Sequence, residues 1–253
     1  MNPTLLRSVI EDPDSDAPRF AYADWAAQQP EEAHREHAVF IRGQIEIARA
    51  EPGAIPSGEY AWMRELHSRA LARFGTEWSN GVAAFVDGYE FERGFVGLVK
   101  MSAKGFAENS AVVFDAAPIR HLDLTKGGDM DQRFFTLKTF SRLRSLAMDE
   151  CGLHDSHIRW VIDAGQVAGL RWLSLKKNQL GLGAAEMMAE SKLFSALQFA
   201  NFSGNPVDVS EQLGYDAGVI VSAWLPPEGE RLEKRFGPLS WLHKHEQNMN
   251  RYG

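Results

Sequence analysis

The second half of the chain carries apolar residues at spacings that recur along the sequence. Residues 170–180 have leucine at positions 1, 4, 6 and 11 and asparagine at position 9. The same pattern fits residues 143–153, with Cys151 in place of the asparagine, and residues 197–207, with Asn205 there. Each copy begins 27 residues after the one before it. Similarity at a fixed period is the sequence signature of a repeating architecture.

Two weaker copies precede these three. One begins at Ile119 and has Gly127 in the asparagine position, and a degenerate one begins at Val96. The successive periods are therefore 23, 24, 27 and 27 residues. The alternative is a set of unrelated buried strands that align by chance. The agreement of several positions across consecutive copies favours a true repeat.

The pattern has a structural explanation. Side chains alternate in a strand, so positions 4 and 6 point to the same side, which we expect to be the buried interior. The asparagine ends the strand, and its side chain can bond backbone groups of neighbouring turns. Asn178 and Asn205 can do this fully, Cys151 only weakly and Gly127 not at all. Three leucines at the inward positions should be completely buried: Leu146, Leu173 and Leu175.

The rest of each copy is predicted to return as a helix. Residues 184–190 are rich in helix-forming residue types. Residues 156–162 place Ile158, Val161 and Ile162 at helical spacing. A strand followed by a helix within 27 residues is similar to the ribonuclease-inhibitor type of leucine-rich repeat. The expected fold class is therefore α/β, a leucine-rich-repeat solenoid of short parallel strands and outer helices with an N-terminal helical cap.

Helical patterns fill the N-terminal part of the chain. Asn2 can cap a first helix, and a second should run over about residues 18–25. A loop at residues 53–58 leads to a fourth helix at about 59–74, and the chain becomes strand-like after Gly75. The residues expected on the buried faces of the third and fourth helices are Phe40, Ile41, Ile45 and Ala48, then Met63, Leu66, Ala70 and Leu71.

Short motifs spread over most of the chain carry a family resemblance. They are Leu5-Leu6, Asp12-Pro13, Ala17-Pro18-Arg19, Tyr22-Ala23-Asp24-Trp25, Phe40-Ile41-Arg42-Gly43-Gln44, Phe91-Glu92-Arg93-Gly94-Phe95, Leu232-Glu233, Arg235-Phe236-Gly237-Pro238 and Trp241-Leu242. Together they resemble bacterial leucine-rich-repeat proteins that begin with a repeat-companion domain. Residues 26–30 depart from the family's usual segment after the tryptophan. The resemblance implies a non-enzymatic repeat scaffold and says little about its partners.

The expected domain organisation has three parts, because both ends of a solenoid expose apolar faces and need caps. Residues 1–94 form the helical repeat-companion and capping region. Residues 95–206 hold the repeats, and residues 207–253 form the C-terminal cap. The candidate packing residues of that last cap are Trp224, Leu225, Leu239 and Trp241.

Composition narrows the functional classes. The net charge of −7 over 253 residues argues against general nucleic-acid binding, which needs clustered Lys and Arg. The sequence shows neither a secretory signal nor an apolar stretch long enough to span a membrane. Cys151, the single cysteine, suits a reducing compartment. We therefore expect a cytoplasmic protein with a protein partner, without nucleic acid or membrane.

Several residue groups could suggest chemistry, but the repeat explains them better. His154 and His157 are three residues apart, whereas helical metal pairs prefer four. Gly181 and Gly183 lack the third glycine of a dinucleotide loop, and we interpret them as a tight turn. Cys151 should be a buried, inert residue. Other pairs have simpler explanations: His34 and His37 fit a solvated helix face, and Asp24, near Tyr22, fits a polar contact between helices. We expect no catalytic residue, no cofactor and no metal.

The sheet face opposite the buried leucines is the candidate binding site. Equal pattern positions should line up in columns across parallel strands. The columns are His121, Ser145, Trp172 and Phe199; Asp123, Ala147, Ser174 and Asn201; and Thr125, Asp149, Lys176 and Ser203, with Leu98 and Lys100 as additions from an earlier strand. Trp172 and Phe199 would form an exposed aromatic pair, typical of a protein-binding anchor, or would pack under the C-terminal segment. Of these residues we take His121, Asp123, Asp149, Trp172, Ser174, Lys176, Phe199 and Asn201 as the candidate partner-binding set.

The leading functional hypothesis is a non-enzymatic scaffold that recognises a partner protein on this face. One alternative is an immunity or antitoxin protein that inhibits a toxin enzyme, which the acidic charge would suit if that enzyme were basic. Another is a regulatory or structural subunit of a larger assembly. A hydrolase hidden in the caps is a further class, but the sequence offers it no matched nucleophile and base. The partner and the oligomeric state are not identified by the sequence.

Overall fold

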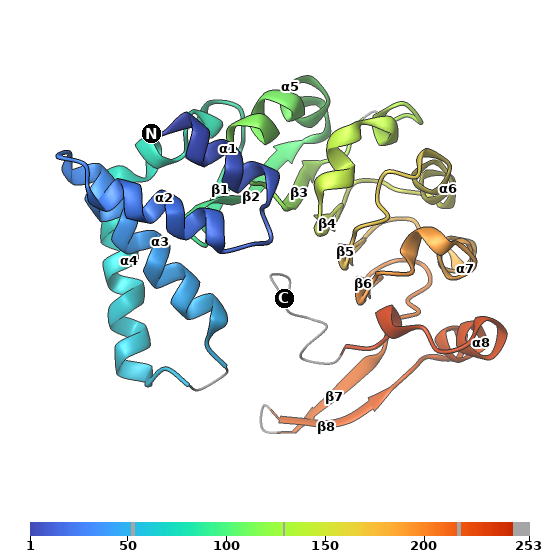
Figure 1. Cartoon of the computed structure of the whole chain (residues 1–253). Helices are drawn as coiled ribbons and strands as arrows, with labels where there is room; N and C mark the ends of the chain where they lie inside the picture. The colour runs from blue at the N-terminus through green and yellow to red at the C-terminus, as the bar shows by residue number, and fades with distance from the viewer. Residues whose placement is uncertain (52–53, 129, 217–218, 245–253) are drawn as a thin grey trace. The chain divides into compact units, whose positions relative to one another are not determined.

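A computed structural model describes residues 1–51, 54–128, 130–216 and 219–244 (Figure 1). In these residues the chain is an α/β protein, as expected. Its helices are α1 (Pro3–Glu11), α2 (Ala17–Ala27), α3 (Glu32–Arg49), α4 (Ser57–Trp78), α5 (Ala103–Ala116), α6 (Asp155–Ala164), α7 (Leu182–Glu190) and α8 (Pro227–Phe236). Its strands are β1 (Gly88–Glu92), β2 (Phe95–Ser102), β3 (His121–Lys126), β4 (Ser145–Ala147), β5 (Trp172–Ser174), β6 (Phe199–Asn201), β7 (Gln212–Asp216) and β8 (Val219–Trp224).

Strands β1 to β6 form one mostly parallel sheet in chain order, and β7 and β8 form a separate antiparallel pair. The chain divides into two compact units. The first contains Met1–Val99 and Asn109–Arg120, and the second contains Lys100–Glu108 and the residues from His121 onward.

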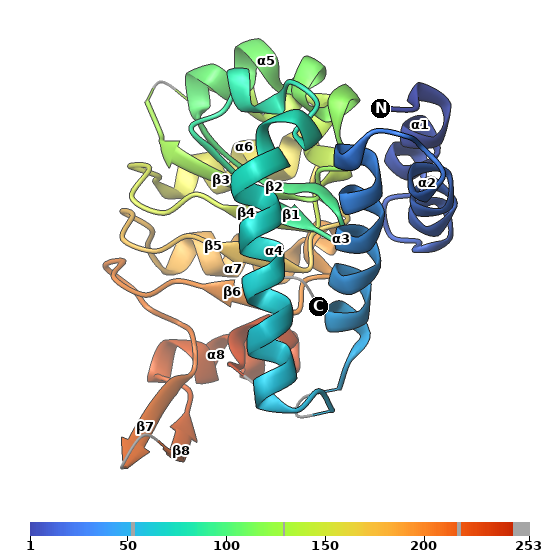
Figure 2. The ribbon, with the colours of Figure 1, turned by 90° about the vertical axis from the view of Figure 1, so that its left-hand side faces the viewer.

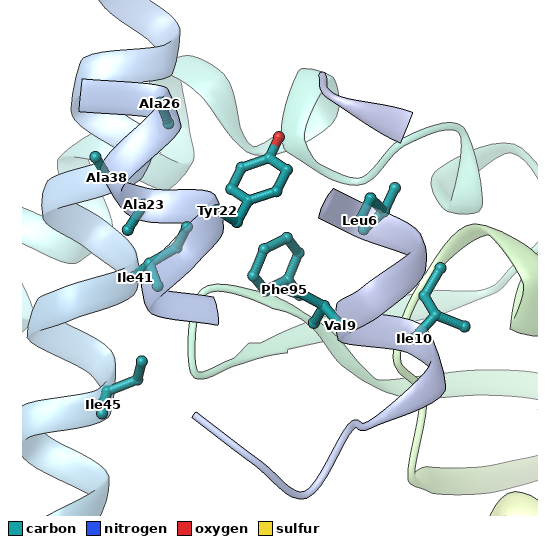
Figure 3. Close-up of a cluster of buried hydrophobic side chains, with 10 residues drawn as sticks. All are labelled: Leu6, Val9, Ile10, Tyr22, Ala23, Ala26, Ala38, Ile41, Ile45 and Phe95. Carbon is teal, nitrogen blue, oxygen red and sulfur yellow. The ribbon is translucent and has the colours of Figure 1, made fainter. Parts of the chain in front are cut away.

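The first unit is built on the helices that the sequence predicts. The side chain of Asn2 caps α1 by accepting hydrogen bonds from the backbone N–H groups of Thr4 and Leu5, at 3.1 and 3.2 Å. Apolar side chains of α1, α2 and α3 meet Phe95 of β2 in a common core (Figure 3). The members of this core are Leu6, Val9, Ile10, Tyr22, Ala23, Ala26, Ala38, Ile41, Ile45 and Phe95. The N-terminal helices are therefore held together by burial of their apolar faces.

Three details of the helical prediction are wrong. Ala48 is exposed, because the last turn of α3 extends past the buried face. Helix α4 does not end near Phe74 but continues to Trp78, whose ring is buried. Leu66, expected to point inward, is 38% exposed, because it lines an open groove between α3 and α4.

In the second unit, β3 to β6 have the register that the repeat spacing predicts. His121 pairs with Ser145, Ser145 with Trp172 and Trp172 with Phe199. The inward leucines are buried as expected, with Leu146, Leu173 and Leu175 at most 2% exposed. The spacing of the pattern therefore fixes which residues are neighbours across the strands.

The segments that return from these strands differ. Helices α6 and α7 follow β4 and β5, as predicted, and lie side by side (Figure 1). After β3 the chain returns through two short 3-10 helices, Phe134–Thr136 and Lys138–Arg142, instead of an α-helix. Ring contacts with Phe106 hold this segment, at centroid distances of 5.9 Å to Phe134 and 4.9 Å to Phe140. Large aromatic side chains here supply the packing that a longer helix supplies after β4 and β5.

Among the expected C-terminal packing residues, Trp241 is buried and its ring centroid lies 6.1 Å from that of Phe202. Leu225 and Leu239 are half-buried. The expectation for Trp224 is wrong, because it is 51% exposed at the end of β8, a strand that has only β7 beside it in the described part of the chain. Across the described residues, no helix is both long and apolar enough to cross a membrane.

Candidate protein-binding face

The first column of the candidate face is largely covered. The rings of Trp172 and Phe199 stack with centroids 5.7 Å apart and planes 28° apart. Phe199 is only 4% exposed and Trp172 is half-buried. His121, also buried, places its Nδ1 2.8 Å from the hydroxyl oxygen of Ser145. The aromatic pair exists as predicted, but its expected exposure is wrong for Phe199, because stacked side chains on strands about 4.8 Å apart cover one another.

The second column has two buried residues in the middle, Ala147 and Ser174, and a half-buried residue at each end. Ser174 is buried, whereas Asp123 and Asn201 are half-buried. The side-chain oxygen of Asn201 accepts two hydrogen bonds from Ser203, just past the end of the strand. One comes from the backbone N–H at 3.0 Å and the other from the Ser203 hydroxyl at 2.7 Å. Leu98, expected to add to this face from β2, is buried as well. The open part of the face is therefore smaller than the sequence predicts.

The third column carries the accessible charges. The carboxylate of Asp149 accepts from the hydroxyl of Ser174 at 2.5 Å and from the backbone N–H of Lys176 at 2.9 Å. Its other oxygen lies 3.2 Å from the ammonium nitrogen of Lys176. The Asp149 and Lys176 side chains are 30% and 43% exposed. One acid and one base thus lie two residues beyond the ends of the neighbouring strands β4 and β5, and both are accessible to a partner.

Asparagine side chains hold the strand ends beneath this face. The side-chain oxygen of Asn178 accepts from the backbone N–H groups of Cys151 and Leu153 at 2.9 and 3.0 Å. Its amide nitrogen donates to the carbonyl oxygens of Met148 and Leu175 at 2.8 and 2.9 Å. Asn205 repeats the arrangement one turn later, accepting from the N–H groups of Asn178 and Leu180 and donating to the carbonyl oxygens of Leu175 and Phe202.

The two earlier equivalents of these asparagines behave as predicted. The thiol of Cys151 contacts the carbonyl oxygens of Asp149 and Leu124 at 3.3 and 3.7 Å, which are weak bonds. Burial, with a smaller contribution from the Asp149 charge, raises the pKa of Cys151 to about 11. A side chain at Gly127 would collide with the backbone, because a Cβ atom there would lie 2.1 Å from the carbonyl oxygen of Cys151. The ladder of side-chain bonds is therefore strongest toward β6.

Residues that could have suggested other chemistry have structural roles. His157 accepts at Nδ1 from the backbone N–H of His154, 3.0 Å away, at the start of α6. The carboxylate of Asp155 accepts from the N–H of Gly181 at 2.7 Å, and so fills the entrance of α7 that a phosphate would need. Asp24 pairs with Arg42 between α2 and α3, as expected. Within the described ranges, no group of three or more His, Cys, Asp or Glu residues could hold a metal ion.

His37 is a buried residue that the sequence interpretation placed on a solvated surface. It is 1% exposed, and its Nε2 donates to the carbonyl oxygen of Gly94 at 2.7 Å. Its ring stacks on Trp78 at 4.5 Å. Burial outweighs the Gly94 bond and lowers the pKa of His37 to about 4. The signal that could have placed it inside is its spacing of three and four residues from Phe40 and Ile41.

The comparisons with known proteins add no assignment to this geometry. No family model, curated protein or solved structure matches the chain.

Proposed function

We propose that this chain is a non-enzymatic, protein-binding leucine-rich-repeat scaffold of the repeat-companion type, which recognises a partner protein on the face of β3 to β6. The observation that carries the proposal is the alignment of residues 27 positions apart, such as Trp172 and Phe199, on neighbouring parallel strands. The asparagine ladder supports it further, because each ladder side chain bonds the backbone of the preceding turn.

The chemistry of the face favours a protein over a nucleic acid. Its accessible charges are mixed, with Asp149 and Lys176 paired and Asp123 nearby in the sheet. Phosphate recognition would need several cations in these columns. Trp172, half-buried at the edge of the aromatic stack, is the candidate anchor. A narrower form of the proposal is an immunity protein, because the net charge of −7 would suit a basic enzyme as partner.

The test uses the tagged full chain as bait in its native host, with mass spectrometry of the captured proteins. The control variant is Lys192→Glu, which also replaces a lysine by glutamate but at an exposed residue after α7, away from this face in sequence. A partner that binds the face of β3 to β6 should still be captured by this control. Its capture should fall with Lys176→Glu, which changes association rate and salt dependence at a rim. In calorimetry with that partner, Trp172→Ala should weaken binding roughly thirtyfold.

Two outcomes would contradict the proposal. Equal binding by the folded Trp172→Ala, Lys176→Glu and control variants would place the site away from this face. If the chain converted a captured small molecule into a product, and a single substitution abolished that conversion, the chain would be an enzyme. A captured basic nuclease that the chain inhibits would select the immunity form, and a fixed multi-protein assembly would select a regulatory subunit.

A further inference from the structure

A groove between α3 and α4 in the first unit is a second candidate surface, separate from the sheet face. It has a volume of about 500 Å³, within the range of small binding sites. The two helices run side by side along it (Figure 2). Its large apolar lining residues are Val39, Phe40, Trp62, Met63, Leu66 and Phe74. We define the α3–α4 groove by these six residues.

Large apolar side chains stand open in this groove. Val39 is 64% exposed, Trp62 is 62% exposed and Leu66 is 38% exposed. Phe40 and Met63 form the buried floor beneath them. Scattered apolar residues are normal on a protein surface, but a concave cluster containing an exposed tryptophan marks an interaction site.

Packing at the centre of the groove keeps the two helices close. A Cβ atom at Gly43 would lie 2.7 Å from Nε2 of His67, so glycine allows the His67 ring to rest against α3. Farther along, Arg73 of α4 binds both carboxylate oxygens of Glu32 at 2.6 Å. The helices are thus joined at two places, and the apolar surface beside the joints stays open.

The charged residues around the groove differ in whether they already have an ion-pair partner. The cations are already paired, Arg42 with Asp24, Arg69 with Glu65 and Arg73 with Glu32. Glu36 and Glu46 also line the groove, and neither makes an ion pair within the residues that the structure describes. They are ten positions apart on α3, which is about 15 Å at the rise of an α-helix. The groove therefore presents an apolar floor between two acidic positions.

We propose that the α3–α4 groove binds an amphipathic helix of a partner protein, with an apolar stripe flanked by two basic residues about 15 Å apart. An apolar stripe at positions i, i+3 or i+4, and i+7 fits a groove of this kind. The two basic residues would meet Glu36 and Glu46. The proposal goes beyond the sheet face, because all of its residues belong to the first unit.

The experiment measures fluorescence anisotropy of two labelled synthetic helical peptides with the same leucine stripe. One has lysine at the two flanking positions and the other has glutamate there. The protein should bind the lysine peptide about tenfold more tightly than the glutamate peptide. Leu66→Glu, an exposed substitution, should weaken the lysine peptide about tenfold or more while circular dichroism stays unchanged.

A charge exchange separates a specific site from general attraction to an acidic protein. Glu36→Lys with Glu46→Lys should reverse the preference, so that the glutamate peptide binds more tightly. The matched control, Glu190→Lys with Glu230→Lys, changes the net charge by the same amount at exposed positions of the second unit and should keep the original preference.

Several results would overturn the proposal. These are no lysine-peptide binding at millimolar concentration, equal losses in the groove and control variants, or no effect of Leu66→Glu. Self-association of the protein alone that Leu66→Glu abolishes would instead assign the groove to a second copy of the chain. Because no sheet-face residue is changed, these results are distinguishable from failure of the proposed function.

Discussion

The two units bury polar side chains in different ways. In the second unit, Asn178, which is buried, and Asn205, which is half-buried, make the same hydrogen bonds 27 residues apart, each to the backbone of two turns. In the first unit, His37 and Arg19 are each 1% exposed, and each has its own arrangement of partners. The difference teaches that a buried polar group can be predicted from sequence when its environment repeats, and is easily missed when it occurs once.

Arg19 shows how individual the second kind of burial is. Its guanidinium donates to the carbonyl oxygen of Ser15 at 3.2 Å and lies 5.8 Å from the centre of the Phe95 ring. Burial, and then the charge of Arg93, lower the pKa of Arg19 to about 10, against the opposing effect of nearby acids such as Asp16. The guanidinium still remains protonated at neutral pH, and its charge is stabilised by partners from several segments.

The largest expected loss of stability comes from removing one of the two asparagine side chains, Asn178. Asn178→Ala leaves the buried N–H groups of Cys151 and Leu153 without their side-chain acceptor and should cost about 2–5 kcal/mol of unfolding free energy. Urea denaturation measures this loss. The control is Gln179→Ala, which removes a neighbouring exposed amide and should change stability by less than about 0.5 kcal/mol. Equal losses in both variants would mean that the ladder contributes no special stability.

The ladder also shows what the sequence could predict. The spacings of 24, 27 and 27 residues predicted the register of β3 to β6, and the pattern predicted the burial of Leu173 and the bonding of Asn178, because one local pattern recurs in one environment. The exposure of Phe199 was not predictable in this way, since it depends on how much of a side chain its neighbours cover. His37 and the open side of α4 depend on contacts between distant segments, for which helical periodicity gives only a weak signal.

The next effect is a pH dependence of the first unit. His37 has a pKa of about 4 when folded and about 6.5 when unfolded, so the unfolded chain binds the proton more tightly. Its contribution to stability is therefore present above pH 6.5 and is lost as pH falls toward 4, by up to about 3 kcal/mol. Unfolding measured from pH 7 to pH 5 should show wild type losing more stability than His37→Gln. Parallel curves for the two proteins would contradict the buried neutral histidine.

The smallest effect concerns reactivity. With a pKa of about 11, the Cys151 thiol should alkylate at pH 8 at least about a hundredfold more slowly in the folded protein than in urea. Mass spectrometry after timed iodoacetamide treatment gives both rates. Similar rates in the two states would show that the cysteine position of the ladder opens readily, unlike the asparagine positions.

The asparagine ladder has an evolutionary consequence. Each 27-residue segment from β4 to β6 ends with a side chain that satisfies the backbone of the segment before it. A duplicated segment would arrive with its own donor and acceptor and would find the complementary groups in either neighbour. Gene duplication can therefore lengthen this part of the protein without redesigning its interior. The single contacts of His37 allow no such copying, so growth of the chain is expected between β4 and β6 and not among the N-terminal helices.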